Sequence, residues 1–355
     1  MISRGRESAS INKVLLDVVE KTALVLETNN LRAGGDEALV VSSLKRVLTH
    51  LFDQSVPLKS LAQLVITHDG LDESTCQDLE SISGCNIDFV LIDKSTGYYS
   101  AKNSGFNATD PEKCKWVVFA DADCLPDHTW LAELLSPFSV CDQLKVVAGR
   151  TSYSADLPGI ALSTLDFMYF PSPLTETGTR NFYANNVVFY RDTFADYCYQ
   201  DLSGVYRAHC QVLGLKLQSE GVPVYFASKA HTVHRFPDSW TEVLKLRWFR
   251  GQDTYGLTPF LVKAYLPSSM QWLGRSGPVG PLCVLISRLY CSLRSLNKQD
   301  LPRLSGMRWI LAVLLIIGFS AIDMSGALLR GLGVRISRGE YGADAQALSY
   351  HKLSP

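Results

Sequence analysis

The sequence has no excess of charge of either sign and no tract of low complexity. Its 34 Lys and Arg residues are balanced by 35 Asp and Glu residues, which gives a formal net charge of -1. The basic field that usually attracts nucleic acid is therefore absent, and we expect no nucleic-acid partner. With 46% hydrophobic and only 19% charged residues, the chain is not intrinsically disordered. Its 355 residues suffice for one large α/β domain and an appendage.

Paired cysteine motifs and a secretion signal are also missing. The nine cysteines are scattered along the chain, and none forms a C-x-x-C pair. This argues against a disulfide framework and against a structural zinc site, and it favours a reducing compartment. Near the N-terminus, acidic residues appear before any apolar run of signal-peptide length, which gives no support for secretion. We therefore expect the catalytic part in the cytosol.

Two common nucleotide-binding signatures do not occur. The chain has neither G-x-G-x-x-G nor G-x-x-x-x-G-K-[ST], so neither an NAD dehydrogenase nor a P-loop NTPase is favoured. A nucleotidyltransferase remains an alternative, because such enzymes use a Gly-rich loop with basic residues near the N-terminus. Leu31–Gly35 is a thin candidate for that loop, since it lacks the further basic residue.

The longest apolar stretch lies near the C-terminus. It runs from Trp309 to Ile322 and continues past Asp323 to Leu329, which is about the length of a membrane span if one carboxylate is tolerated. Three placements remain open: a span, a surface-lying or re-entrant helix, and a buried core helix. The preceding segment, Val279–Leu296, mixes apolar residues with arginines as an amphipathic surface helix does. We expect this part to associate with the cytoplasmic face of a membrane.

Short apolar runs alternate with helical patterns in the first third of the chain. The expected strands are Thr22–Glu27, Leu61–Thr67, Ile87–Asp93 and Trp116–Ala120, and the expected helices are Asp36–Phe52, Asp72–Ser81 and Tyr98–Asn107. This alternation predicts an α/β fold with a Rossmann-like, mostly parallel sheet flanked by helices. We expect a leader over residues 1–20, a catalytic domain over 21–260, a linker over 261–280, hydrophobic and amphipathic helices over 281–340, and a polar tail over 341–355.

Two carboxylates, Asp121 and Asp123, follow the expected strand Trp116–Ala120 in the segment WVVFADADCLPDHTW. Side chains at positions i and i+2 point the same way at the end of a strand, where open α/β sheets place their ligands. Such a pair suits a hard divalent cation that bridges the phosphates of a nucleotide. A bare D-x-D is also common in solvated turns, so its context along the chain decides between the two readings.

Five segments in this order resemble the family-two glycosyltransferases that have a GT-A fold. They are Glu27-Thr28-Asn29, Lys102-Asn103 in GYYSAKNSGFNA, the D-x-D, Asn185-Asn186 in NFYANNVVFYRDTF, and SEGVPVYFASKAHTVHRFP, in which the expected strand ends at His234. The resemblance covers roughly residues 20–255. It implies metal-dependent transfer of a sugar from a nucleotide-diphosphate donor to an acceptor hydroxyl, and a lipid-linked acceptor is the hypothesis that the apolar tail motivates.

The resemblance also implies residue roles. Asp123 and His234 would hold Mn2+ or Mg2+, whereas the nearby His231 would point away and has no expected role. The residues expected to contact the donor are Glu27, Asn29, Asp69, Lys102, Asn103 and Asp121, and those expected to contact the acceptor are Asn185 and Asn186.

A further segment, LKLRW, is similar to the QxxRW motif of membrane polysaccharide synthases, with Leu244 in place of Gln. The similarity implies that Arg247, Trp248 and Arg250 meet the donor diphosphate or stack on a sugar ring. Because the chain offers one hydrophobic anchor, we expect transfer of single sugars rather than extrusion of a polymer.

The sequence departs from the family at the position of the general base. Inverting members have a Glu-Asp pair at the start of the helix before an L-x-x-x-G segment, and these positions are His209 and Cys210 here. Histidine is a competent base near neutral pH, so we predict that His209 takes this role, with Asp201 as an alternative. The departure also admits a retaining mechanism, or a catalytically degenerate protein that binds sugar nucleotides as a scaffold.

Overall fold

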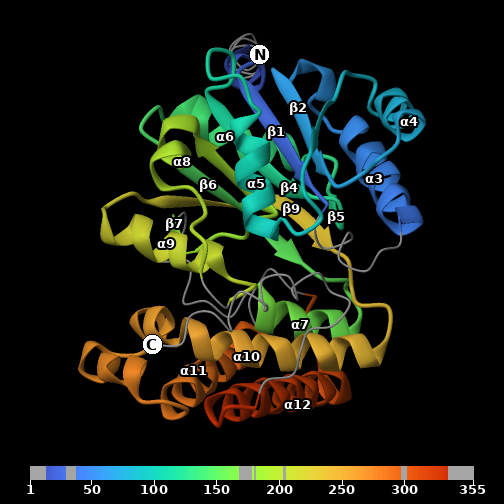
Figure 1. The fold of residues 1–355 in the computed structure, drawn as a ribbon. Coiled ribbons are helices and arrows are strands. Elements are labelled where there is room, and N and C mark those ends of the chain that lie inside the picture. The colour runs from blue at the N-terminus through green and yellow to red at the C-terminus, as the bar shows by residue number, and fades with distance from the viewer. Residues whose placement is uncertain are drawn as a thin grey trace, which may run out of the picture.

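A sheet and a layer of helices beneath it form the molecule (Figure 1). The computed structural model describes residues 13–28, 37–167, 178–179, 181–202, 205–296 and 302–334. Among these residues the sheet has nine strands, in the order β3-β2-β1-β4-β8-β6-β9-β5, with β7 paired to β9. The leader and the polar tail expected from the sequence lie outside the described residues or at their margins.

The first half of the sheet is parallel, as the alternation of patterns predicts. Its strands are β1 (Thr22–Glu27), β2 (Gln63–His68), β3 (Asp88–Leu91) and β4 (Trp116–Asp121). The helices of this half are α3 (Glu37–Phe52), α4 (Glu73–Ser83) and α5 (Tyr98–Asn107). All seven elements that the sequence predicts here are confirmed, with ends that differ by a few residues at most.

The second half of the sheet is mixed rather than parallel. Strand β8 (Asn186–Tyr190) runs antiparallel between β4 and β6 (Val146–Ser152). Strand β9 (Val224–His234) is parallel to β6, while the short strands β5 (Cys124–Pro126) and β7 (Gly178–Thr179) are antiparallel to β9. The expectation of a mostly parallel sheet therefore holds only for the first half.

Alternate residues of β1 enter two different cores. Leu24 and Leu26 pack with α3 and with α6 (Trp130–Val140) on one face. Ala23 and Val25 pack with α5, α8 (Arg191–Tyr197) and α9 (His209–Ser219) on the other face. Because both faces are covered, β1 is an uninterrupted apolar run, and its carboxyl end is held rigidly beside that of β4.

A layer of helices covers the carboxyl edge of the sheet (Figure 1). It contains α7 (Leu157–Asp166), α10 (Trp240–Tyr265), the 3-10 helix η2 (Ser268–Arg275), α11 (Val279–Ser295) and α12 (Gly306–Gly331). Helices α10 and α12 approach each other at two glycines: a Cβ added to Gly251 would overlap the carbonyl of Asp323, and one added to Gly326 would overlap that of Trp248. The backbones are thus in direct contact, which small residues permit.

A buried ion cluster ties this layer together. Arg247 of α10 is fully buried; its Nη1 donates to Asp166 of α7 at 2.6 Å, and its Nε donates to Asp323 of α12 at 2.9 Å. The other guanidinium nitrogen, Nη2, also donates to Asp323. The carboxylate that interrupts the apolar stretch is therefore paired inside the protein, as a buried charge must be.

Helix α12 contains the whole apolar stretch noted in the sequence. Within the described residues it is the one helix long and apolar enough to cross a membrane, with a mean hydropathy of 2.1, and this holds by length and composition only. About two fifths of its most apolar window, 39%, is buried inside the protein. The structure thus combines two of the placements left open above, a core face and an exposed apolar face.

Candidate functional site

A cavity of about 120 Å³ opens between the carboxyl edge of the sheet and the helical layer. The sheet side contributes Tyr98, Asp121, Asn185 and His234, and the helical side contributes Asp166, Arg250, Asp253 and Arg288. The cavity is therefore lined by carboxylates and guanidinium groups together with aromatic rings. Such a lining suits a ligand that carries charge and hydroxyl groups.

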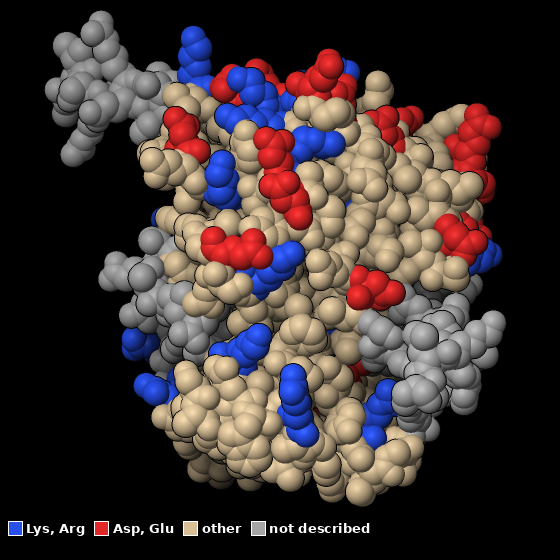
Figure 2. Space-filling view, turned by 60° about the vertical axis from the view of Figure 1, so that its left-hand side comes forward, with Lys and Arg blue, Asp and Glu red and all other residues tan. Residues whose placement is uncertain are grey.

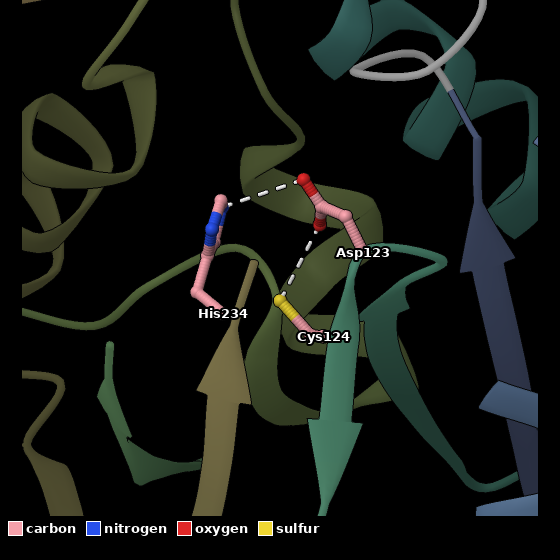
Figure 3. A group of neighbouring side chains, drawn as sticks. All are labelled: Asp123, Cys124 and His234. Carbon is pink, nitrogen blue, oxygen red and sulfur yellow. Dashed lines mark hydrogen bonds and ion pairs between the residues drawn. The ribbon is translucent and has the colours of Figure 1, made fainter. Parts of the chain in front are cut away.

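Asp123 faces His234 (Figure 3), and of the two His234 lines the cavity. The Oδ2 atom of Asp123 lies 3.5 Å from Nε2 of His234. Strand pairing creates this arrangement, because β5 and β9 are antiparallel with Cys124 opposite His234, and Asp123 directly precedes β5. The two residues that the sequence assigns to a metal, more than a hundred positions apart, are thus brought together.

The hydrogen bonds around His234 fit a metal ligand. Its Nδ1 lies 2.8 Å from the carbonyl oxygen of Arg235, to which it donates as the N–H tautomer. The other ring nitrogen, Nε2, points to Asp123 and would offer its lone pair to a metal in the tautomer that donates through Nδ1. Metal-binding histidines are usually oriented in this way by a carbonyl or carboxylate behind the ring.

Cys124 completes a group of three potential ligand atoms that lie within 4.8 Å of one another. Its thiol donates to Oδ1 of Asp123 at 3.5 Å and accepts from Nδ2 of Asn185 at 3.3 Å. Burial and the nearby Asp123 raise the pKa of this thiol well above its usual range, so it stays protonated. The donor set is therefore one carboxylate and one imidazole, which suits Mg2+ or Mn2+ better than a thiophilic metal.

Asp121, the first carboxylate of the D-x-D, is held in place by two side chains of α5. The hydroxyl of Tyr98 donates to it at 2.6 Å, and the ammonium of Lys102 pairs with it at 2.5 Å. Burial raises the pKa of Asp121, and the Lys102 ammonium opposes this shift. Lys102 is itself fully buried and does not line the cavity, so its expected contact with the donor is corrected to a role in holding Asp121.

The two neighbouring asparagines have different positions. Asn185 lines the cavity, and its side chain is bonded to Thr151 and Cys124. Asn186 is completely buried; it accepts from the indole N–H of Trp130 and donates to the carbonyls of Arg150 and Ala230. With both ends of its amide bonded internally, Asn186 is not an acceptor-binding residue, and that expectation is corrected.

The remaining residues expected at the donor are spread along the same edge of the sheet. Glu27 ends β1, is buried, and pairs in register with Asp121. Asp69 follows β2 and is half-buried, and Asn29 lies outside the described residues. Asn103 instead exchanges two hydrogen bonds with the backbone of Tyr199, which gives it a structural position away from the cavity.

Of the three residues around the LKLRW segment, Arg250 alone lines the cavity. Its Nη1 lies 2.7 Å from Asp166, so one carboxylate joins it to the buried Arg247. Arg247 and Trp248 do not line the cavity, and full burial in the ion cluster excludes Arg247 from ligand contact in this structure. The expectation for Arg247 was wrong because the sequence does not reveal which carboxylates will surround it.

The predicted base, His209, points away from the cavity. It is buried, stacks on the ring of Tyr99 at 4.2 Å between centroids, and is hydrogen-bonded through Nε2 to the carbonyl of Val205. It lines a separate small pocket on the other side of α9. Burial lowers its pKa. The alternative base, Asp201, is exposed and is not part of the cavity wall either, so the structure supports neither assignment.

A carboxylate that sequence reasoning missed is Asp253, on the second turn of α10 after Arg247. It is 4% exposed and lines the cavity. Its signal in the sequence was its helical spacing: it lies three residues after Arg250 and thus on the same face of α10. Asp253 lies on α10, after the L-x-x-x-G segment, whereas the base of inverting family members precedes that segment.

His231, for which no role is expected, belongs to a hydrogen-bonded chain on the sheet. Its Nε2 lies 2.8 Å from the hydroxyl of Ser152, and its Nδ1 lies 2.9 Å from Asp127. None of these three residues lines the cavity. These two hydrogen bonds link β6, β9 and the segment after β5. They thereby support β9, the strand that ends at His234.

Comparison with known proteins bears on the fold rather than on the individual residues of the site. Residues 40–199 match the family model described as glycosyl transferase family 2. Among solved structures, a mannosyltransferase from Pyrobaculum calidifontis in complex with GDP-Man and Mn2+ superposes with a TM-score of 0.54 at 13% identity, covering 88% of this chain and 87% of that chain. At this identity the likeness establishes the fold alone. A search of curated proteins gave no match.

Proposed function

We propose that this protein transfers single sugars from a nucleotide-diphosphate donor to an acceptor hydroxyl, because residues 40–199 match the model of glycosyl transferase family 2 and the chain has the GT-A fold. The reaction is metal-dependent and inverts the anomeric carbon. The observation that carries this proposal is that Asp123 faces His234, a residue of the cavity wall, at 3.5 Å.

Asp123 and His234 are the residues that would hold the cation. A bound Mn2+ or Mg2+ supplies charge neutralisation for the diphosphate that leaves the sugar. Asp121, fixed by Lys102 and Tyr98, is placed next to this position to orient the donor. Arg250 lies on the opposite wall, where its guanidinium can pair with a phosphate oxygen.

The acceptor must lose a proton as its oxygen attacks the anomeric carbon. We assign this proton to Asp253, because it is a carboxylate that lines the cavity on the helical side and is nearly excluded from solvent. The acceptor O–H bond breaks to give a protonated carboxyl, a bond forms between the acceptor oxygen and the anomeric carbon, and the bond from that carbon to the diphosphate breaks. The electron pair of the broken bond stays on the diphosphate.

The acceptor belongs at the cytoplasmic face of a membrane and is lipid-linked in this proposal. Support comes from α12, which is apolar enough for membrane contact, and from the nine unpaired cysteines, which favour a reducing compartment.

One assay tests the proposal directly. Purified protein is incubated with Mn2+ and a panel of sugar nucleotides, and nucleoside diphosphate release is measured. GDP-mannose with Mn2+ comes first, because the solved neighbour contains both. Asp123→Asn should abolish release and weaken metal-dependent donor binding.

Asp253→Asn separates the base from the binding site. Removing a general base slows the chemical step by about 10²–10⁴-fold, so we expect kcat to fall in this range while the affinity for the donor stays unchanged. His209→Gln is the matched control and should retain activity. If Asp253→Asn keeps wild-type kcat while His209→Gln loses it, the assignment of the base is wrong.

A scaffold that binds sugar nucleotides without turning them over is the second candidate. The observation that favours it is the pair His209-Cys210, where the family has carboxylates and where both side chains are buried here. It predicts that a donor binds, in a manner sensitive to Asp123→Asn, while no nucleoside diphosphate is released with any donor. Leu31–Gly35, the loop that a nucleotidyltransferase would need, lies outside the described residues.

A further inference from the structure

The outer face of α12 is a continuous apolar stripe. Ile310, Leu314, Ile317 and Leu328 are 47%, 57%, 44% and 38% exposed, and their successive spacings of four, three and eleven residues place them on one side of a helix. The same layer exposes Trp272 of η2 and Ile286 of α11 at 67% and 57%. An apolar surface of this extent normally marks a place of contact with a protein or a membrane.

The charge of this layer points to the kind of partner. In the described residues of 254–334, which cover the end of α10, η2, α11 and α12, the basic side chains other than the buried Arg288 are Lys263, Arg275, Arg294, Arg303, Arg308 and Arg330. The one acidic side chain of this range is Asp323, which is buried and paired with Arg247; the acidic residues of the layer before this range are Asp166 of α7 and Glu242 and Asp253 of α10. The chain as a whole has a net charge of -1, so the basic excess is local. Figure 2 shows this segregation: acidic and basic residues mix over the upper part, while the lowest part is mainly tan and blue.

The inner face of α12 is committed to the protein. Asp323 receives hydrogen bonds from Arg247, and Gly326 lies against the backbone of Trp248 so closely that even a Cβ would not fit. A helix that crossed a bilayer along its whole length would have to break this ion pair and this contact. Leaving a buried charge without its partner is strongly unfavourable.

From these observations we infer that α12 does not cross the membrane but lies in its plane, and that its outer stripe together with the surrounding arginines docks the enzyme on an anionic lipid surface. Apolar side chains enter the interface while basic side chains meet anionic headgroups, as in other amphipathic membrane anchors.

Docking in this orientation places the cavity close to the lipid. Arg250 and Asp253 reach the cavity from α10, and α12 packs on α10 at Gly251. The cavity is thus separated from the bilayer surface by about one to two helix diameters, each about 10 Å. An acceptor in the membrane could enter from this side, although the docking itself does not depend on the proposed transfer reaction.

Vesicle binding of the full chain, without any donor, tests the surface. The protein is co-sedimented with vesicles of phosphatidylcholine, alone or mixed with phosphatidylglycerol. We expect stronger binding to the anionic vesicles, weakened by salt because exposed charges are screened. The double variant Leu314→Glu/Ile317→Glu should weaken this binding by at least about tenfold.

A matched control separates the stripe from added charge in general. Leu91→Glu/Val140→Glu adds the same charges at apolar positions that are 70% and 86% exposed on the α/β part of the molecule, and it should bind vesicles like the wild type. Circular dichroism confirms that both variants fold. If the stripe variant binds vesicles as well as this control, or only changes a dimer to a monomer in gel filtration, the outer face contacts a second copy and the inference is overturned.

Sidedness distinguishes lying in the membrane from crossing it. The chain carries one tag before residue 1 and another after residue 355, and it is bound to sealed vesicles with the catalytic part outside. An impermeant protease should remove both tags, because a helix that lies in the plane of the membrane leaves both ends of the chain on the outer side. Protection of the C-terminal tag, with the N-terminal tag removed, would show that α12 spans the bilayer and would overturn the inference.

Discussion

Replacement of Arg247 by Met is the sharpest test of how the helical layer is held together. The methionine fills a similar volume but leaves Asp323 without the hydrogen bonds that Nε and Nη2 donate. Asp166 keeps its second partner, Arg250, at 2.7 Å. One carboxylate thus remains buried without its guanidinium, which costs about 3–5 kcal/mol in comparable sites. We expect the free energy of unfolding to fall by this amount.

The double variant Arg247→Met/Asp323→Leu shows whether the loss comes from the stranded charge. Apolar replacements of a whole buried ion pair are often neutral or stabilising. The double variant should therefore be more stable than Arg247→Met alone, although it carries one more substitution. Urea-induced unfolding, followed by circular dichroism for the four proteins of the cycle, gives the coupling energy between the two residues.

Additive losses in this cycle would refute the reasoning. In that case Arg247 would contribute by packing its side chain rather than by neutralising Asp323, and the argument that α12 is locked to α10 by charge would fail. A coupling energy of several kcal/mol would support it.

Two further predictions concern packing and pH. Gly251→Ala should destabilise the protein by about 1–3 kcal/mol, because the added methyl overlaps the backbone of Asp323; Gly318→Ala on α12, which has nothing within 4 Å, should be neutral or slightly stabilising. The pKa of His209 lies below its usual 6.5 because the ring is buried, so the unfolded chain binds the proton first as pH falls. The free energy of unfolding should therefore fall as the pH drops through the usual histidine value of 6.5, and His209→Gln should reduce this fall in urea titrations, with the exposed His50→Gln as the control.

The parallel half of the sheet could be predicted because each of its strands and helices has a recognisable pattern within its own short segment of sequence. Buried strands such as Thr22–Glu27 and Trp116–Asp121 have continuous apolar runs, and the helices between them have clear amphipathic spacing. The carboxyl ends of parallel strands meet at one edge, which places Asp121 and Glu27 side by side. Order and spacing were therefore enough to locate the candidate site.

Partners that are distant in sequence could not be predicted. Whether the ammonium of Lys102 contacts a ligand or pairs with Asp121 depends on how α5 packs against the sheet. The sequence pattern around Lys102 is the same in both cases. His209 occupies the position of a carboxylate in the family, but its ring stacks on Tyr99 and turns away from the cavity. The spacing of Asp253 from Arg250 is visible in the sequence, but its place in the cavity wall depends on how α10 packs beneath the sheet.

The pair of Arg247 and Asp323 also bears on how the chain is made. The ribosome delivers Arg247 seventy-six positions before Asp323, so the partner of the carboxylate is already synthesised when α12 emerges. An ionised Asp in the middle of an apolar helix disfavours insertion by the translocon by about 2.5–3.5 kcal/mol. A single acidic residue thus makes it less favourable to sort this segment as a transmembrane helix, which is consistent with the proposed docking of α12 in the membrane plane.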